Sequence, residues 1–349
     1  MNNKLLIGRA AAYCETDNSI WYVGKNASFL FQVDLYKFEV VKMIGIPKLD
    51  NASGFDYINV IDDGDIIYII SYDAKIIVQY NKENEKVEVW KVPVEFEKSG
   101  VRRVYSAITF KENIYLIGCL DYKDIIVFNT VTREVKEIKN TEECNSFSYC
   151  CMLEDNTLII PYLEKNKIMR IDLDNNHQDV IQIENNNEGY MDCVIVEDGY
   201  VFVTPSGRIV KFDKSYNMIW ERNIYSKIFC VRAIQNNKIA VWGLYNEKVW
   251  LVSEYGEVSE LNIVVTELSV FNNSEYSKFE LVVSTKDKVL FQQRTTGEFY
   301  VLENECIKKT DIFVSESKSD EIYKSLKTRG EIYSEGEIIG CKEFLRMLS

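Results

Sequence analysis

The sequence predicts an all-β protein built from seven repeats of four antiparallel strands. The first observation behind this prediction is composition. The 349 residues include 22 Tyr, 17 Phe and many Ile and Val, which suit a pleated and half-buried surface, but only 4 Pro. The second is a very apolar segment that recurs every 38 to 47 residues between Ile20 and Phe279. That interval is the period of a four-stranded repeat unit.

The recurring segment is expected to be the second strand of each repeat. Most copies follow a turn rich in Asp, Asn or Gly, such as IDDGD or LEDNT, which favours the left-handed backbone of a tight hairpin. A second hairpin follows in each repeat, as in IIVQYNKENEKVEVW, and its last strand alternates apolar and polar residues like an outer strand with one wet face. The seven copies read IWYVG from Ile20, IIYIIS from Ile66, NIYLIG from Asn113, TLIIPY from Thr157, YVFVTP from Tyr200, KIAVWG from Lys238 and FELVVS from Phe279.

One repeat of about 40 residues cannot bury both faces of its own sheet, so the repeats must stack on one another, and closing the stack into a ring protects its ends. The sequence therefore predicts a seven-bladed β-propeller over residues 1–304. In this register every blade supplies its own four strands and the ring closes by packing. Pairing of residues 4–7 with the last blade is the alternative that the register leaves open.

The repeat also resembles known families. The unit NIYLIGCLDYKDIIVFNTVTREVKEI resembles a kelch-type repeat in layout, and the period over residues 4–304 is similar to that of the wider seven-bladed β-propeller superfamily, WD-repeat proteins included. The Gly-Gly pair of kelch units is absent, as are the WD dipeptide and its Gly-His partner. The resemblance implies the fold and a general habit of ligand binding, and it assigns no functional residue.

Residues 305–349 depart from the repeat and are expected to form a C-terminal helical tail. The segment SESKSDEIYKSLKTRG begins with Ser caps, places apolar residues on one helical face and stops at Gly330. A second short helix is expected from Glu337 to Leu348. We expect the tail to dock on its own ring, with a contact to a partner protein as the alternative.

Charge and cysteine usage restrict the partners and the compartment. The formal charge of −13 repels a phosphate backbone, so a nucleic-acid partner is not expected. No stretch approaches the ~20 apolar residues that cross a bilayer, and the first residues lack an export signal, so we expect no membrane insertion. Nine cysteines without CxxC spacing fit the reduced thiols of a cytoplasmic protein.

Motifs for metal or nucleophilic chemistry are missing. The chain has one histidine, His177, and lacks HExxH, GxSxG and a phosphate-binding P-loop. We therefore expect no metal and no cofactor, and a solvated turn position for His177. Cys150 and Cys151 are successive residues of a predicted innermost strand, so their side chains point to opposite faces and cannot share a metal. We interpret both as core residues.

The candidate ligand site is the mouth of the central channel. In propellers the innermost strand of each blade starts at the face where ligands usually bind, so the residues at its entry surround that mouth. Neighbouring tyrosines could supply aromatic platforms for a sugar or a peptide, although packing between blades would explain them equally well. Counting back from the second strands brings Arg9, Asp56 and Arg103 into register, with Ser146 and Gly189 in the next two blades and Tyr57, Tyr105, Tyr149 and Tyr190 beside them.

Three functions remain open at this point. The first is a non-catalytic scaffold or interaction module whose loop face binds a protein, a peptide or a small polar, carbohydrate-like ligand. The second is a carbohydrate-active hydrolase or lyase with paired carboxylates at the channel mouth. The third is a structural role within an oligomer joined through the tail. Missing catalytic motifs favour the first of these.

Overall fold

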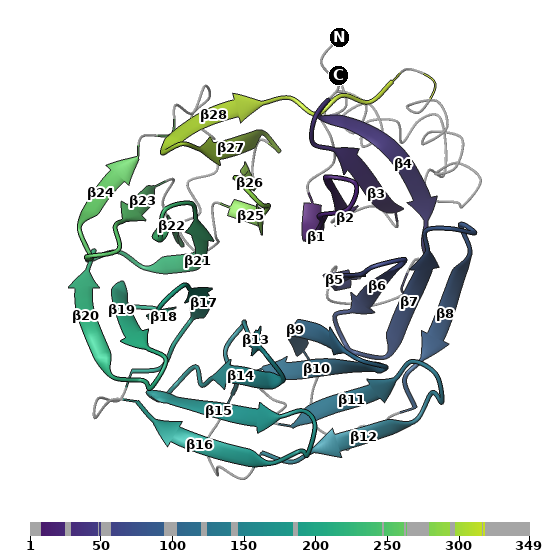
Figure 1. The fold of residues 1–349 in the computed structure, drawn as a ribbon. Coiled ribbons are helices and arrows are strands. Elements are labelled where there is room, and N and C mark those ends of the chain that lie inside the picture. The colour runs from purple at the N-terminus through teal and green to yellow at the C-terminus, as the bar shows by residue number, and fades with distance from the viewer. Residues whose placement is uncertain are drawn as a thin grey trace.

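The computed structural model is an all-β, seven-bladed β-propeller (Figure 1), as the sequence predicts. It describes residues 8–24, 29–47, 49, 57–93, 103–119, 124–140, 146–183, 188–245, 248–261, 263, 279–293, 297–315 and 317. Within these ranges 28 strands form seven four-stranded antiparallel sheets, each built from one continuous stretch of chain. The first strand of every sheet lies nearest the centre of the ring and the fourth lies at the rim (Figure 1).

The first four blades follow the chain in order. Blade 1 comprises β1 (Gly8–Cys14), β2 (Ser19–Gly24), β3 (Phe29–Asp34) and β4 (Glu39–Gly45). Blade 2 comprises β5 (Tyr57–Asp63), β6 (Ile66–Ser71), β7 (Ile76–Asn81) and β8 (Val87–Lys91). Blade 3 comprises β9 (Arg103–Phe110), β10 (Asn113–Cys119), β11 (Ile125–Asn129) and β12 (Val135–Ile138). Blade 4 comprises β13 (Met152–Glu154), β14 (Thr157–Pro161), β15 (Lys167–Asp172) and β16 (Gln178–Gln182).

The last three blades complete the ring. Blade 5 comprises β17 (Asp192–Val196), β18 (Gly199–Val203), β19 (Arg208–Asp213) and β20 (Met218–Asn223). Blade 6 comprises β21 (Ile228–Ile234), β22 (Lys238–Gly243), β23 (Val249–Val252) and β24 (Val258–Leu261). Blade 7 comprises β25 (Phe279–Ser284), β26 (Val289–Gln293), β27 (Phe299–Glu303) and β28 (Cys306–Thr310).

The core lies between the blades. Every described residue of β2 and β18 is buried, whereas β20 and β24 are mostly exposed, because only the inner strands are covered by a neighbouring sheet on each face. The buried residues described here form seven clusters, and each cluster joins two adjacent blades. In one of them Trp21 of blade 1 packs against Tyr80 of blade 2 with ring centroids 5.4 Å apart. Burial between sheets therefore holds the ring together.

The predicted tight turns between first and second strands adopt left-handed backbone conformations. Positive φ angles occur in five such turns, at Asn18, Gly64, Lys111 and Asp155 and at the neighbouring Asn236 and Asn237. Asn, Asp and Gly tolerate this region better than other residues, which explains why these residue types recur at the same point of the repeat. The local turn chemistry thus fixes where each pair of inner strands reverses.

The prediction that FELVVS is a second strand is wrong. In the structure this segment is β25, the innermost strand of blade 7, and its partner β26 (VLFQQ) is the second strand. The third and fourth strands shift accordingly, so the last sheet continues past Asn304 to Thr310. The inner strand β26 ends in two glutamines whose side chains are almost fully buried, which hides its inner position from a search for apolar runs.

The ring closes between blades 7 and 1 by packing and by a short strap after β28. Each blade provides its own four strands, as predicted, while the residues at 4–7 lie outside the described ranges. Phe313 makes a parallel bridge to Glu39, and its carbonyl accepts a hydrogen bond from the Val40 backbone nitrogen at 2.9 Å. Ile312 and Val314 are buried in the cluster that joins blades 1 and 7. Figure 1 shows this segment running from β28 to the outer edge of β4.

Of the predicted tail, residues 305–349, the structure describes 305–315 and Ser317, and both predicted helices otherwise lie outside the described residues. Its first residues, 306–310, form β28 instead. No helix within the described ranges has the length and apolar character needed to cross a bilayer.

Candidate functional site

The innermost strands of all seven blades surround a cavity of about 960 Å³ at the centre of the ring. This volume lies within the usual range for small-molecule sites. Most of the described lining residues are apolar or carry a thiol, and the charged ones are Asp192 and Arg232. Each blade contributes to the wall, with Ala10, Ile58, Tyr105, Met152, Asp192, Cys230 and Val282 as examples from blades 1 to 7.

Asp192 and Arg232 form an ion pair between blades 5 and 6. Asp192 is the first residue of β17, and Arg232 lies within β21 of the next blade. The Arg232 Nη1 atom donates to Asp192 Oδ2 at 2.7 Å, and the same oxygen accepts from the Val231 backbone nitrogen at 2.9 Å. Asp192 Oδ1 accepts from the Cys193 backbone nitrogen at 2.9 Å. The carboxylate therefore has three donors and ties two innermost strands together.

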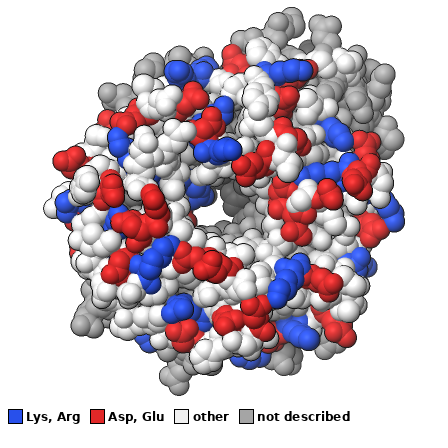
Figure 2. Space-filling view, in the orientation of Figure 1, with Lys and Arg blue, Asp and Glu red and all other residues white. Residues whose placement is uncertain are grey.

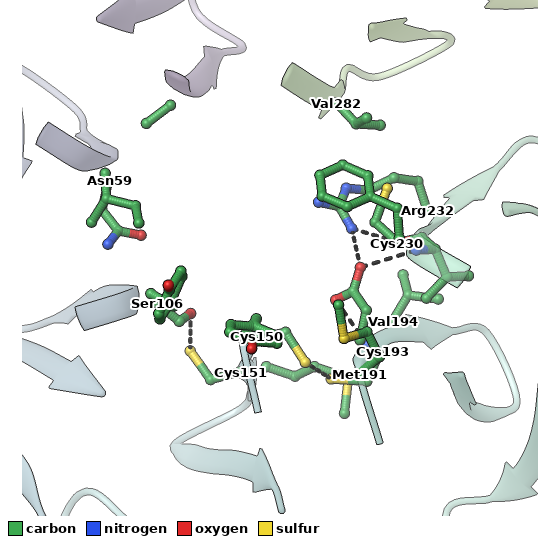
Figure 3. A pocket seen from close by; sticks show the side chains of 18 of the residues that line it. Asn59, Ser106, Cys150, Cys151, Met191, Cys193, Val194, Cys230, Arg232 and Val282 are labelled. Carbon is green, nitrogen blue, oxygen red and sulfur yellow. Dashed lines mark hydrogen bonds and ion pairs between the residues drawn. The ribbon is translucent and has the colours of Figure 1, made fainter. Parts of the chain in front are cut away.

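The guanidinium of Arg232 remains available to the cavity. Its side chain is 30% exposed, against 9% for Asp192, and Figure 3 shows it pointing into the channel. Burial acts to lower the pKa of Arg232, but the charge of Asp192, its hydrogen bond to Arg232 and the nearby thiols together outweigh burial and hold this pKa above its ordinary value. Nη1 also donates to the Val231 carbonyl at 2.6 Å, while Nε and Nη2 make no hydrogen bond to any residue that the structure describes. The wall thus carries a permanent cation with free donors.

Two further polar side chains, Asn59 at the channel wall and the fully buried Ser148, also link neighbouring blades. The Asn59 amide nitrogen donates to the Val104 carbonyl at 3.3 Å, which joins blades 2 and 3. The Ser148 hydroxyl donates to the Met191 carbonyl at 2.7 Å, which joins blades 4 and 5. These contacts satisfy backbone groups that the innermost strand of a sheet leaves without a partner strand. They give Asn59 and Ser148 a structural role.

Four thiols border the cavity, and two of them touch. The Sγ atoms of Cys150 and Cys193 lie 3.1 Å apart across blades 4 and 5, whereas Cys151 contacts the Ser106 hydroxyl at 3.1 Å on the other side (Figure 3). As expected for successive residues, Cys150 and Cys151 pack against different core clusters. Burial raises the pKa of Cys151 to about 12 and also raises that of Cys230. Cys151 and Cys230 are therefore protonated at neutral pH.

Aromatic side chains form another part of the wall. Tyr105 and Tyr149 both line the cavity and meet edge to face with ring centroids 4.6 Å apart. The Tyr105 hydroxyl lies 3.1 Å from that of Tyr72, which continues the row into blade 2. Such a row gives a rigid surface on which a flat or apolar group could stack.

The structure places the predicted mouth residues in different environments. Tyr105 and Tyr149 border the cavity, whereas Tyr57 and Tyr190 are almost fully buried between blades. The Tyr57 hydroxyl donates to the Pro47 carbonyl at 2.7 Å, and Tyr190 packs on Phe202 with centroids 4.8 Å apart.

The charged members of the predicted set cannot be placed in the same way. Asp56 lies outside the described residues, and the side chains of Arg9 and Arg103 lie outside them too, although both backbones belong to first strands. Ser146 is buried, and a Cβ at Gly189 would meet the Leu163 carbonyl carbon at 2.2 Å, so the backbones approach closely there.

Asp192 and Arg232 were missed by the sequence analysis. The count back from the second strands selected Gly189, three residues before Asp192, in blade 5 and was not carried into blade 6, where Arg232 lies within β21. One signal could have found them. Each is a single charged residue in an otherwise apolar innermost strand, and buried charges in proteins are usually paired.

Charged side chains surround the channel, and the one histidine of the chain lies away from it. Figure 2 shows acidic and basic side chains interspersed around the central opening. His177 lies in the exposed turn between β15 and β16 at the rim of blade 4. Within the described ranges, no three His, Cys, Asp or Glu side chains come close enough together to hold a metal ion.

Comparison with known proteins gives a fold and no family. No family model matches the chain, and no curated protein matches it. A streptogramin B lyase structure superposes with a TM-score of 0.66 at 14% identity, over 89% of this chain and 95% of that one. Virginiamycin B lyase from Staphylococcus aureus gives 0.65 at 13% identity, over 84% and 94%. BamB from Moraxella catarrhalis gives 0.53 at 11% identity, over 82% and 81%. At these identities the likeness concerns the propeller fold alone.

Proposed function

We propose that the protein is a non-catalytic binding module that takes a small monoanionic ligand with an apolar or aromatic body into its central channel. A short peptide with a free carboxylate is one ligand of this chemistry. The observation that carries the proposal is a single guanidinium in a wall whose other described residues are mostly apolar or carry a thiol, with two of its nitrogen atoms donating to no residue that the structure describes. Both a protein partner and a carbohydrate-like ligand are less well matched to such a wall.

The charge of the wall favours one negative charge on the ligand. Arg232 already shares its charge with Asp192 at 2.7 Å, so the pair is neutral and a second anion meets only the remaining donors of the guanidinium. A planar carboxylate can accept two hydrogen bonds from Nε and Nη2 side by side. A dianion would be repelled by the overall charge of −13, and the wall offers little positive charge to offset that repulsion.

The remaining wall suits the ligand body. Tyr105 and Tyr149 offer ring faces or edges, and Phe229, Val282 and the thiols add apolar area. Burial of apolar surface supplies most of the affinity in sites of this kind, and a few polar groups fix the orientation.

The wall gives little support for catalysis by paired carboxylates. Among its described residues Asp192 is the single carboxyl group, and three donors already occupy it. Glycosidases need a second carboxyl group at a defined distance. One lyase among the structural neighbours is a catalytically inactive histidine-to-alanine variant with quinupristin. Here the one histidine, His177, is exposed at the rim, so a lyase reaction that needs a histidine in the channel is also not favoured.

We also propose a cytoplasmic location. The six described cysteines are free thiols, and four of them border one cavity. Thiols persist in this form in compartments kept reduced. Fractionation of the producing cell would test the location.

Two dyes of similar shape test the proposed ligand class. Anilinonaphthalene sulfonate carries one negative charge on an aromatic body, and N-phenylnaphthylamine is its uncharged counterpart. We expect the native protein to bind both dyes in the channel. The double variant Asp192→Asn with Arg232→Met removes the ion pair without leaving one charge unpaired, and it should weaken binding of the anionic dye by roughly 10-fold to 100-fold, the range for a charge-assisted hydrogen bond.

A matched control is the surface pair of Arg170 and Asp179, 3.8 Å apart on blade 4. Replacing these two in the same way should leave binding of both dyes unchanged. Equal loss of the neutral and the anionic dye in the channel variant would show damage to the cavity rather than to anion recognition. Unchanged binding of the anionic dye would refute the proposed role of Arg232.

A further inference from the structure

Cys150 and Cys193 form a close thiol pair in the channel wall. Their sulfur atoms lie 3.1 Å apart, and Figure 3 shows them facing each other from neighbouring blades. A disulfide bond has a sulfur separation of about 2.05 Å, so the two atoms need to approach by only about 1 Å. The pair comes from the chain just before β13 and from β17, so its covalent bond would cross an interface between blades that packing and non-covalent polar contacts now hold.

Both thiols can be reached from the cavity, and Cys150 more easily than Cys193. Both belong to the channel lining, but Cys193 is only 7% exposed whereas Cys150 is partly exposed. Burial and the neighbouring Cys150 thiol raise the pKa of Cys193 well above its ordinary value, so Cys193 is protonated at neutral pH. A small oxidant entering the channel therefore meets Cys150 first and finds Cys193 behind it.

We infer that Cys150 and Cys193 are a reversible dithiol site that a hydroperoxide oxidises to a disulfide between blades 4 and 5. The Cys150 thiol gives up its proton as its sulfur attacks one oxygen of hydrogen peroxide; the O–O bond breaks, Cys150 becomes a sulfenic acid, and the leaving hydroxide takes up that proton as water. The Cys193 sulfur then attacks the Cys150 sulfur, the S–O bond breaks, and hydroxide leaves and takes up the Cys193 proton as water. In total two thiols and one peroxide give one disulfide and two waters.

The neighbouring thiols provide internal controls for this chemistry. Cys151 borders the same cavity, but its sulfur contacts Ser106 instead of another thiol. Cys230 also borders it, and no described thiol lies within hydrogen-bonding distance of its sulfur. Selective pairing of Cys150 with Cys193 therefore depends on their geometry and not on a shared cavity alone. The inference does not depend on the ligand proposed above.

The test is peptide mapping of the native full-length chain after treatment with hydrogen peroxide. Free thiols are then blocked with iodoacetamide in denaturant, and disulfides are located by mass spectrometry with and without dithiothreitol. We expect a loss of two alkylated thiols out of nine, a Cys150–Cys193 cross-link, and full recovery with dithiothreitol. Cross-links distributed among other cysteines, a Cys150–Cys151 link, or oxidation of Cys150 to sulfinic acid without a cross-link would each overturn the inference.

Two variants sharpen the result. In Cys193→Ser the sulfenic acid on Cys150 loses its resolving thiol, so dimedone should trap it and excess peroxide should carry it to the sulfinic acid. In Cys230→Ser, a substitution in the same cavity, the Cys150–Cys193 cross-link should form as in the native chain. Dimedone labelling of the native chain equal to that of Cys193→Ser would count against resolution by Cys193, and mapping of the native chain keeps its meaning if a variant folds poorly.

Discussion

Removing the carboxylate of Asp192 should weaken the contact between blades 5 and 6 by a predictable amount. The substitution Asp192→Ala takes the acceptor from the Val231 backbone nitrogen, which is completely buried, and an unsatisfied buried donor costs about 1 to 3 kcal/mol. It also leaves Arg232 without its partner, but that side chain is 30% exposed to the channel, so water limits this loss to about 1 kcal/mol. The free energy of unfolding should therefore fall by about 3 kcal/mol, from these two contributions.

Asp192→Asn separates the two contributions, because the amide oxygen can still accept from Val231 while the charge is gone. Its expected cost is about 1 kcal/mol, the charge contribution alone. Urea unfolding followed by far-UV circular dichroism measures all variants, provided that the slope with urea stays constant.

Asp179→Ala is the matched control, because Asp179 also pairs with an arginine, at 3.8 Å, but on the exposed outer strand of blade 4. Its loss should stay within about 0.5 kcal/mol. If Asp192→Ala costs no more than Asp179→Ala, the carboxylate does not join the blades. If Asp192→Asn costs as much as Asp192→Ala, the charge and not the hydrogen bond to Val231 is what matters.

Three further predictions concern the ring closure, the turns and pH. Ile312→Ala should cost about 2 to 4 kcal/mol in urea unfolding, whereas Phe313→Ala, at a side chain 44% exposed, should cost less than about 1 kcal/mol; equal costs would contradict the closure described here. Gly199→Ala puts a Cβ 1.9 Å from the Phe212 carbonyl oxygen, so it should lower the melting temperature strongly. Gly64→Ala should lower it far less, because no atom lies within 4 Å of the new Cβ and only the φ of 71° disfavours alanine, by about 1 kcal/mol. Burial acts to raise the pKa of Glu154, but hydrogen bonds from a lysine and a tyrosine of blade 5 outweigh burial and lower this pKa. The ionised Glu154 therefore stabilises the fold fully above the unfolded-state pKa of about 4.3, and this stabilisation is lost as the pH falls through the folded-state pKa. Glu154→Gln should therefore flatten the acid side of the stability profile, and an unchanged profile would disprove this.

The fold could be predicted because its strongest signal is local. Six of the seven second strands are apolar in their central residues, since neighbouring blades cover both of their faces. Turn residues such as Asn18 and Gly64 mark hairpins before these strands. The seventh failed for a physical reason. Strand β26 carries Gln292 and Gln293 in the core, and the Gln292 amide donates to the Gly297 carbonyl at 2.8 Å, so a satisfied polar group replaces an apolar one.

The site was harder to predict, because it is assembled from strands far apart in the sequence. Tyr105 and Tyr149 could be placed near the channel from the repeat alone, whereas the pairing of Asp192 with Arg232 depends on how the neighbouring sheets β17 and β21 are set against each other. The same holds for the thiol contact between blades 4 and 5. A repeat period gives the position of a residue along its blade, and only the packed ring gives its neighbours across the channel.

The continuous origin of each blade has an evolutionary consequence. Every sheet is formed by one unbroken stretch of sequence, and within the described residues the last blade shares no strand with the first, although Phe313 after it makes backbone hydrogen bonds to Phe38 and Val40. Duplicating or deleting one such segment adds or removes a complete sheet and leaves the pairing of all others intact. The number of blades is then selected by how well the packing angle between adjacent sheets closes a full circle. The residues that line the centre can change one blade at a time.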